Sequence, residues 1–430
     1  MLPATDLSPA ELAHRYAAVR ATTLALAEPL SEADAQVQSM PDASPAKWHL
    51  AHTTWFFETL VLERFEPGFR PHHPAYRVLF NSYYNGIGEL AARPQRGLIT
   101  RPGLAEVLAY RRAVDERVLA LLAAAPGAEV LALLTLGLHH EQQHQELILT
   151  DLLHLLSCNP LWPAYRKALP PPVAAAAVPL AWLPHDGGLA EIGHAGPGFA
   201  FDNEQPRHRA WLAPYALANR LVTQGEWADF VADGGYRDPR WWLAAGWDWL
   251  RSQHIEYPLY WRRDGSGWRV FTLRGAVALQ PDAPVVQISL YEADAFAAWA
   301  AAQQRLTIRL PTEAEWEHAA APGAEAAIAE GNLLDSDRLQ PRPALARPGL
   351  QQLFGDAWEW TRSAYAPYPG FRPWQGAVGE YNGKFMANQF VLRGGSCATP
   401  RSHLRASYRN FFPADARWQF SGLRLACDPA

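Results

Sequence analysis

The composition of this 430-residue chain changes between Pro160 and Pro184, and this change implies two halves that are built differently. Before it, the chain is rich in Leu, Ala and Glu, with apolar residues at helical spacing. After it come short strand-like runs with many Gly, Pro and Trp. The change itself contains Leu169-Pro170-Pro171-Pro172 and then Ala174 to Ala177, which predict a stiff connector without a periodic apolar face.

We therefore predict two domains, which also suits the length. The predicted boundaries are a first domain at 1–165, a connector at 166–184 and a second domain at 185–430.

The first domain is predicted to be a bundle of four helices. Their approximate ranges are 8–28, 44–63, 103–125 and 128–157. Ser8-Pro9-Ala10-Glu11 has the form of a capping box with proline at the first helical position, and Ser44-Pro45 begins the second helix in a similar way.

The second half is predicted to be an α+β domain with long ordered loops. Its clearest helical patterns lie near 224–232, 291–303 and 312–320. The overall prediction is thus an all-α domain followed by an α+β domain.

Charge and cysteine content narrow the possible partners and compartment. The formal net charge of −5 argues against a nucleic-acid-binding protein, which would carry a basic face. The three cysteines, Cys158, Cys397 and Cys427, form neither a CxxC motif nor an even framework, which favours a reducing cytoplasm. The apolar stretch from Val118 to Leu138 is broken by Pro, Gly and Glu, so we expect no membrane span there. The expected partners are small molecules.

The strongest chemical signal is the sequence His139-His140-Glu141-Gln142-Gln143-His144 in the fourth predicted helix. His140 and His144 are four residues apart and therefore lie on one helical face, where two imidazoles can reach one metal ion. A third ligand would come from the second helix, where the residues leave His49 and His52 open.

The same residues allow an alternative interpretation. His140-Glu141-Gln142-Gln143-His144 matches the HExxH pattern of zinc hydrolases, in which the glutamate is the general base. The downstream glycine and third histidine of one such class are missing, so this interpretation is the weaker one.

Longer stretches resemble a known family. The first half is similar to the DinB-like bundle of ergothioneine-biosynthesis sulfoxide synthases (EgtB-like), and the second to the C-type-lectin-like fold of formylglycine-generating enzymes, also called sulfatase-modifying factors. The matching stretches are 44–52, 140–146, 309–317, 355–360, 392–396, 408–412 and 417–422. The shared fold with lectins also leaves a non-catalytic binding module as an alternative.

The resemblance implies an enzyme that uses Fe(II) and O₂ to join a thiol to the imidazole of hercynine, the trimethylated betaine of histidine. It implies His52, His140 and His144 as the iron ligands. Three neutral imidazoles would leave coordination positions open for substrate and O₂. A selenoneine synthase, which uses a selenosugar in place of the thiol, is a close relative and an alternative.

The resemblance also suggests residues that act on the donor. In one branch of the family a tyrosine from the bundle loop acts as an acid near the iron, which here indicates Tyr83 or Tyr84. Arg93 and Arg96 follow, and two guanidiniums three residues apart can hold a carboxylate.

Residues of the fourth predicted helix and of the C-terminal tail are candidates for hercynine binding. Gln143 lies beside His144, and the tail supplies Asn410, Phe411 and Phe412. An aromatic ring such as Phe411 suits a quaternary ammonium group. The tail has Phe412 where another branch has an aspartate that helps to hold γ-glutamylcysteine, so cysteine and γ-glutamylcysteine both remain possible donors.

Overall fold

The computed structural model describes residues 5–166, 168–170 and 177–429. The chain divides into two compact units. Unit 1 comprises residues 1–160, 195–202 and 372–384, and unit 2 comprises 161–194, 203–371 and 385–430. Two short segments of the second half therefore pack with the bundle. Of the predicted connector, residues 167 and 171–176 lie outside the described residues, and β1 begins at Trp182. The predicted domain boundaries remain a prediction.

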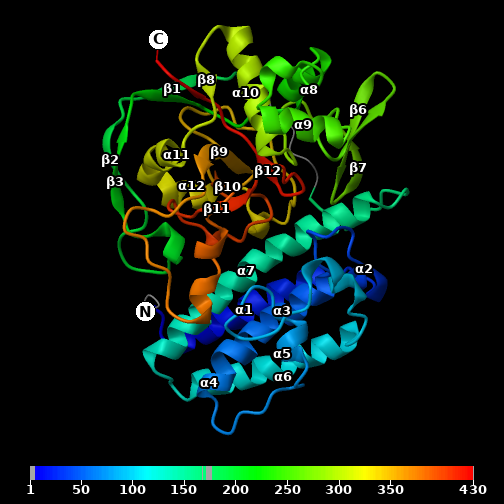
Figure 1. Ribbon diagram of the computed structural model, residues 1–430, viewed down its shortest axis with the longest axis vertical. Coiled ribbons are helices and arrows are strands. Elements are labelled where there is room, and N and C mark those ends of the chain that lie inside the picture. Colours follow the sequence, from blue (N-terminus) through cyan, green and yellow to red (C-terminus); the bar gives the residue numbers. More distant parts are fainter. Residues whose placement is uncertain (1–4, 167, 171–176, 430) are drawn as a thin grey trace. The chain divides into compact units, whose positions relative to one another are not determined.

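Unit 1 is the predicted helical bundle. Its long helices are α1 (Pro9–Ala27), α3 (Ala46–Phe57), α6 (Leu104–Ala123) and α7 (Ala128–Ser157), which pack side by side (Figure 1). The predicted range 44–63 corresponds to α3 continued by one π-helical segment, Glu58–Leu62. Shorter helices are α2 (Glu32–Gln36), α4 (Glu63–Phe65) and α5 (Tyr76–Leu79).

Local sequence explains where α1 begins and why α3 lies at the centre. The Ser8 side chain accepts from the backbone N–H of Glu11, the Glu11 carboxylate accepts from the N–H of Ser8, and Pro9 occupies the first turn. Every residue of α3 is buried, and α3 packs against both α6 and α7. A helix that is buried on all sides holds its side chains in fixed positions, which suits a site of defined geometry.

A glycine allows α7 to come close to α3. A Cβ atom added to Gly137 would lie 2.4 Å from Cε1 of Phe57 and 2.9 Å from Cε1 of Phe56. Both rings are buried. The absence of a side chain at Gly137 therefore sets the distance between the two helices one turn before His140.

A cluster of four charges, of which only Asp115 is partly exposed, lies where α1, α6 and α7 meet. Arg20 bonds Asp115 at 2.6 Å and Glu141 at 2.9 Å, and Arg111 bonds Glu141 at 2.6 Å. Two cations and two carboxylates balance, which is the condition for stable burial of charge. Burial alone would raise the pKa of Glu141, but the charges of Arg111 and Arg20 outweigh it and lower that pKa to about 2.

Unit 2 contains small sheets, short helices and long loops. The strands pair in the orders β1-β4-β13-β8, β11-β10-β9-β12, β2-β3 and β5-β6-β7. Their bounds are β1 Trp182–His185, β2 Gly188–Ile192, β3 His208–Leu212, β4 Tyr215–Ala218, β5 Trp261–Asp264, β6 Gly267–Thr272, β7 Gly275–Ala278, β8 Ile308–Arg309, β9 Trp358–Ala364, β10 Gln389–Arg393, β11 Asn410–Pro413, β12 Ser421–Gly422 and β13 Ala426–Cys427. This is the predicted mixture of helix and sheet.

The helices of unit 2 confirm the three predicted helical ranges. They are α8 (Gln224–Ala232), α9 (Ala244–Ser252), α10 (Leu290–Gln304), α11 (Glu313–Ala320) and α12 (Ala324–Glu330). The sequence analysis did not predict α9 and α12. Within the described part of the chain, no helix combines the length and the hydropathy needed to cross a bilayer.

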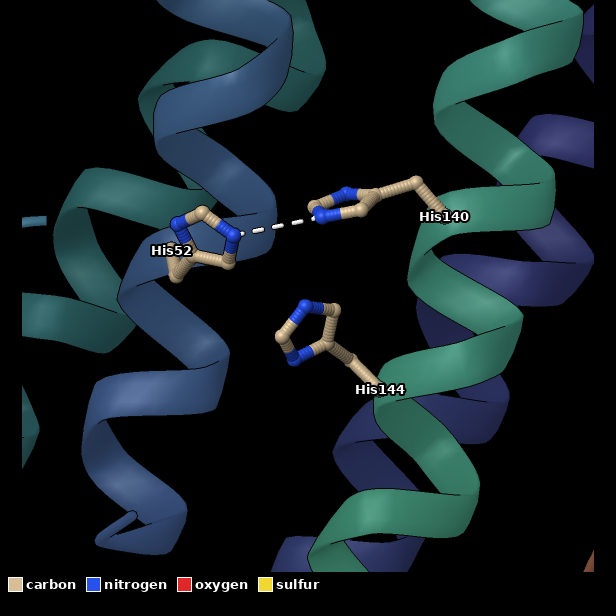
Figure 2. Close-up of side chains that lie close together, drawn as sticks. All are labelled: His52, His140 and His144. Carbon is tan, nitrogen blue, oxygen red and sulfur yellow. Dashed lines mark hydrogen bonds between the residues drawn. The ribbon is translucent and has the colours of Figure 1, made fainter. Parts of the chain in front are cut away.

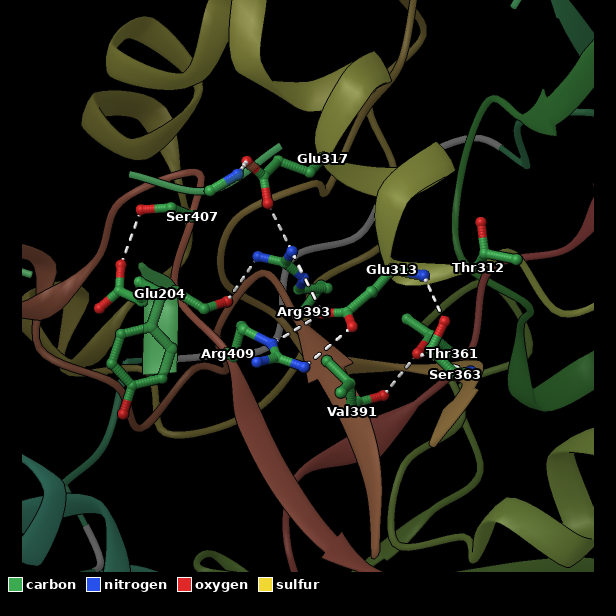
Figure 3. Close-up of polar contacts among 12 residues, drawn as sticks. Glu204, Thr312, Glu313, Glu317, Thr361, Ser363, Val391, Arg393, Ser407 and Arg409 are labelled. Carbon is green, nitrogen blue, oxygen red and sulfur yellow. Dashed lines mark hydrogen bonds and ion pairs between the residues drawn. The ribbon is translucent and has the colours of Figure 1, made fainter. Parts of the chain in front are cut away.

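Paired charges also stabilise the interior of unit 2 (Figure 3). Arg393 on β10 bonds Glu317 on α11, and Arg409 bonds Glu313 at 2.9 Å and 3.0 Å. Both arginines are buried. Each buried cation thus has a carboxylate partner, which identifies this cluster as part of the structural core.

Candidate metal centre

Three histidines from two helices of unit 1 meet in its interior. His52 lies on α3, and His140 and His144 lie on α7, with their rings turned toward one another (Figure 2). One ring nitrogen from each lies within 4.8 Å of the other two, and Nε2 of His52 is 3.2 Å from Nε2 of His140. All three side chains are buried. The geometry therefore allows one metal ion to be held by three imidazoles.

Burial keeps these rings neutral. It is the main cause that lowers the pKa of His140 to about 4 and the pKa values of His52 and His144 well below their ordinary value. A neutral imidazole has a lone pair for a metal, whereas a protonated one does not. Nδ1 of His52 lies 2.6 Å from the carbonyl of Phe80 and must donate to it, so Nε2 carries the lone pair.

These donors suit a divalent transition metal such as Fe(II). Imidazole is a common ligand of iron, copper, nickel and zinc, whereas Mg²⁺ and Ca²⁺ prefer oxygen. Among the described residues, no carboxylate belongs to the three-histidine group. The residues thus fit the predicted iron as well as the other metals that imidazole binds.

Glu141 does not face the histidine group. Its carboxylate accepts from Thr23 at 2.7 Å and is held by Arg20 and Arg111 in the buried charge cluster. A general base must reach the water that it activates. Glu141 is therefore poorly placed for the role that the HExxH interpretation requires.

His49 has both of its ring nitrogens engaged by protein groups. Nδ1 lies 2.8 Å from Nδ1 of His144, and Nε2 lies 3.1 Å from Oδ2 of Asp151. Among the described residues, the converging set is His52 with His140 and His144, and His49 lies behind His144. The assignment of His52 as the third ligand remains a prediction, and the engaged nitrogens of His49 favour it.

A cavity of about 60 Å³ adjoins the three rings. It contains the predicted Tyr83, Tyr84, Arg93 and Arg96 together with the three histidines. Its lining residues are Ser44, Trp48, His49, His52, Ser82, Tyr83, Tyr84, Arg93, Arg96, His140, His144, Leu147, Asp151 and Tyr381. Seven of the predicted site residues thus share one cavity.

Arg96 is the unusual charge in this cavity. Its guanidinium lies 3.5 Å from the ring centre of Trp48 and donates to the hydroxyls of Ser44 and Ser82 at 2.9 Å and 3.0 Å. Only 3% of the residue is exposed, and among the described residues it has no carboxylate partner. Burial lowers the pKa of Arg96 to about 9. A buried cation that no carboxylate contacts directly is costly, so this position favours an anionic ligand.

The two predicted tyrosines differ in their surroundings. The hydroxyl of Tyr83 accepts a hydrogen bond from Arg93 at 2.8 Å. Tyr84 is buried, and its ring lies 5.5 Å from that of Trp55. Burial raises the pKa of Tyr84, so its phenol stays protonated at neutral pH.

Tyr381 is a pocket residue that the sequence analysis missed. It belongs to residues 372–384, the second-half segment that packs with unit 1, and its ring lies 6.2 Å from that of Tyr83. Glu380 accepts from the backbone N–H of Gly86 at 2.9 Å and so fastens this segment to the loop that carries the two tyrosines. No local pattern around Tyr381 indicated this contact.

The remaining predicted residues lie outside the cavity lining. Gln143 is partly buried on α7, one residue before His144. Asn410, Phe411 and Phe412 belong to β11 of unit 2, where Phe411 stacks on Tyr365 at 4.0 Å. The contribution of these four residues to hercynine binding remains a prediction.

Comparisons with known proteins agree with this architecture. Residues 15–148 match the DinB superfamily, and residues 181–429 match the sulfatase-modifying factor enzyme 1-like domain. The fold and the histidine group thus define a class of two-domain enzymes in which a DinB-type bundle precedes a domain of the formylglycine-generating type.

Proteins of known name extend the match to the whole chain. Hercynine oxygenase of Mycobacterium tuberculosis is 35% identical, covering 98% of this chain and 99% of its own. Hercynine oxygenase of Mycolicibacterium thermoresistibile is 34% identical, covering 97% of this chain and 95% of its own. This chain belongs to the hercynine oxygenase family and is an enzyme of the oxygenase type.

Other proteins are similar to only part of this chain. A formylglycine-generating enzyme of Mycobacterium tuberculosis is 26% identical, covering 53% of this chain and 92% of its own. Among solved structures, PvdO from Pseudomonas aeruginosa aligns with 58% of this chain and 94% of its own, with a TM-score of 0.39 and 19% identity.

Proposed function

We propose that this protein is an iron(II)- and O₂-dependent sulfoxide synthase that forms a C–S bond between the imidazole of hercynine and a thiol in ergothioneine biosynthesis. The observation that carries the proposal is the group of three buried, neutral histidines in a bundle of this family. The names of the full-length relatives support hercynine as the substrate.

His52, His140 and His144 would hold the Fe(II). When bound, Fe(II) would supply the activation of O₂ and a Lewis-acid centre for the reacting groups. The protein contributes a buried site in which three neutral ligands leave other coordination positions for the substrates. Bringing the reactants together in one buried place replaces an improbable encounter with a step inside a single complex.

Arg96, with Arg93, would bind a carboxylate of the sulfur donor. Arg96 is a buried cation with two serine hydroxyls as partners, and Arg93 lines the same cavity. A planar guanidinium fits a carboxylate with two parallel hydrogen bonds. This argument favours cysteine or γ-glutamylcysteine over an uncharged selenosugar, which would leave the charge of Arg96 uncompensated.

Tyr84 or Tyr83 would supply the proton that directs the reaction toward coupling. Both tyrosines line the cavity. A phenol that is protonated at neutral pH can donate its proton directly. Gln143 is proposed to orient hercynine, and Phe411, with Asn410 and Phe412, to bind its ammonium group.

The test is a reaction under defined metal and donor conditions. The protein is loaded with Fe(II) without oxygen and then mixed with hercynine, O₂ and cysteine, γ-glutamylcysteine or a selenosugar, and the products are identified by mass spectrometry. We expect a hercynine sulfoxide conjugate with a thiol donor. A selenium conjugate formed in preference would replace the proposed function with selenoneine synthesis.

Variants of the ligands complete this test. Single changes of His52, His140 and His144 to alanine should abolish coupling and strongly reduce bound iron. The matched control is His154→Ala, because His154 lies on the same helix and bonds Ser39 rather than the histidine group. Full iron retention in His52→Ala would contradict the ligand assignment. The HExxH interpretation would be supported if the zinc-loaded protein catalysed hydrolysis and the iron-loaded protein did not couple hercynine to a thiol.

A further inference from the structure

We propose that His49 and Asp151 form a positioning pair that fixes the tautomer and the ring orientation of His144 for metal binding. This inference deepens the proposed function and rests on its metal site. Neither residue is proposed as a ligand. Both act through His144.

The contacts form a continuous chain. The backbone N–H of Ser44 donates to Oδ2 of Asp151 at 2.8 Å. The same oxygen lies 3.1 Å from Nε2 of His49, and Nδ1 of His49 lies 2.8 Å from Nδ1 of His144. The chain therefore runs from a backbone amide through a carboxylate and one imidazole to the metal-ligand candidate.

Hydrogen-bond chemistry assigns the protons along this chain. Oδ2 of Asp151 already accepts from the N–H of Ser44, and a carboxylate oxygen acts as an acceptor, so His49 donates to Asp151 from Nε2. An imidazole that carries its one N–H on Nε2 keeps a lone pair on Nδ1, so Nδ1 of His49 is an acceptor. The short contact between the two Nδ1 atoms then requires His144 to donate, which leaves the lone pair of His144 on Nε2.

The outer nitrogens of the three converging histidines are held differently. Nδ1 of His52 is held by the neutral carbonyl of Phe80, and Nδ1 of His140 has no partner among the described residues. His144 alone in this group is linked to a carboxylate through another ring. Partners of this kind orient a metal-bound histidine and raise its basicity.

The pair is also built into the helices that carry the ligands. His49 lies on α3 three residues before His52, and Asp151 lies on α7 seven residues after His144. His49 is 2% exposed and Asp151 is 7% exposed. Burying a carboxylate beside an imidazole costs free energy of folding. A function in holding the proposed metal ligand His144 explains why this pair is nevertheless buried.

The experiment measures the affinity of the metal-free protein for Co(II), without hercynine, thiol or O₂. We expect His49→Ala and Asp151→Asn each to weaken Co(II) binding by roughly 10- to 100-fold. His49→Gln should weaken it less, because its amide can both accept and donate. His154→Ala, the matched control on α7, should bind Co(II) as the unchanged protein does.

A double variant separates a positioning pair from two independent structural contacts. If Asp151 acts through His49, adding Asp151→Asn to His49→Ala should cost little further affinity. Thermal unfolding of each metal-free variant shows whether it folds. If His49→Ala does not fold, His49→Gln takes its place, alone and combined with Asp151→Asn.

Three results would overturn the inference: unchanged Co(II) affinity in the single variants, independent and additive losses in the double variant, or complete loss of binding in His49→Ala, which would make His49 a ligand. No Co(II) binding by the unchanged protein would overturn the metal site itself. If Co(II) affinity depends on His49 as expected but the iron-loaded protein does not couple hercynine to a thiol, the proposed reaction is overturned and the inference about His49 and Asp151 stands.

Discussion

Removal of the Arg96 side chain tests the carboxylate site directly. Arg96 is 3% exposed, and in place of a carboxylate it has two serine hydroxyls and the face of Trp48 as partners. A hydrogen bond to a charged group contributes about 1.5–3 kcal/mol. Arg96→Ala should therefore raise the apparent KM for the thiol donor by roughly 10- to 150-fold. The KM for hercynine should change little.

The assay compares cysteine with cysteamine, which lacks the carboxylate. Arg96→Ala should raise the apparent KM for cysteine strongly and that for cysteamine hardly at all. Arg96→Lys should raise the KM for cysteine by an intermediate amount, because lysine keeps the charge but lacks the planar guanidinium. Arg112→Ala is the control, since Arg112 is exposed on α6. Co(II) affinity checks that the nearby histidines are intact. An equal rise in the KM for cysteine and for cysteamine would refute the assignment of Arg96 as a carboxylate-binding residue.

Three further predictions concern other positions. Tyr84→Phe or Tyr83→Phe should shift the product from coupled sulfoxide toward sulfinic acid, and Tyr381→Phe is the comparison. If neither Tyr84→Phe nor Tyr83→Phe changes the product ratio, another residue supplies the proton. Burial raises the pKa of Asp356 to about 6, so the folded protein keeps a proton that the unfolded chain releases near pH 4 and stability falls as pH rises from 4 to 6. Asp356→Asn should remove this slope, on the order of 3 kcal/mol in urea unfolding, and an unchanged slope would contradict the burial argument. Glu141→Gln should lower the free energy of unfolding by about 3–5 kcal/mol, because two buried arginines lose an anion, while the iron content of the folded protein stays the same. Loss of turnover with iron retained would instead point to a general base.

The sequence predicted the elements that local patterns determine. The spacing of His140 and His144 and the apolar periodicity of 128–157 predicted α7 at its observed bounds, Ala128–Ser157. Capping residues predicted the start of α1 in the same way. These features depend on neighbours within a few residues, so a single sequence contains the information that specifies them.

The contacts that complete the site depend on residues far apart in the chain. Asp151 meets His49 across 102 positions, and Glu380 meets Gly86 across 294. Tyr381 reaches the cavity because its segment packs with the bundle, and no periodicity near Tyr381 encodes that packing. Only the three-dimensional arrangement of the chain reveals such partners.

Gly137 has a consequence for how this protein can change over generations. Any side chain at this position would meet the rings of Phe56 and Phe57 and push α3 and α7 apart, and these are the helices that carry His52 and His140. Metal preference could therefore drift through packing alone, with every ligand unaltered. A replacement of Gly137 would keep the helix spacing only if Phe56 or Phe57 were replaced by a smaller side chain at the same time.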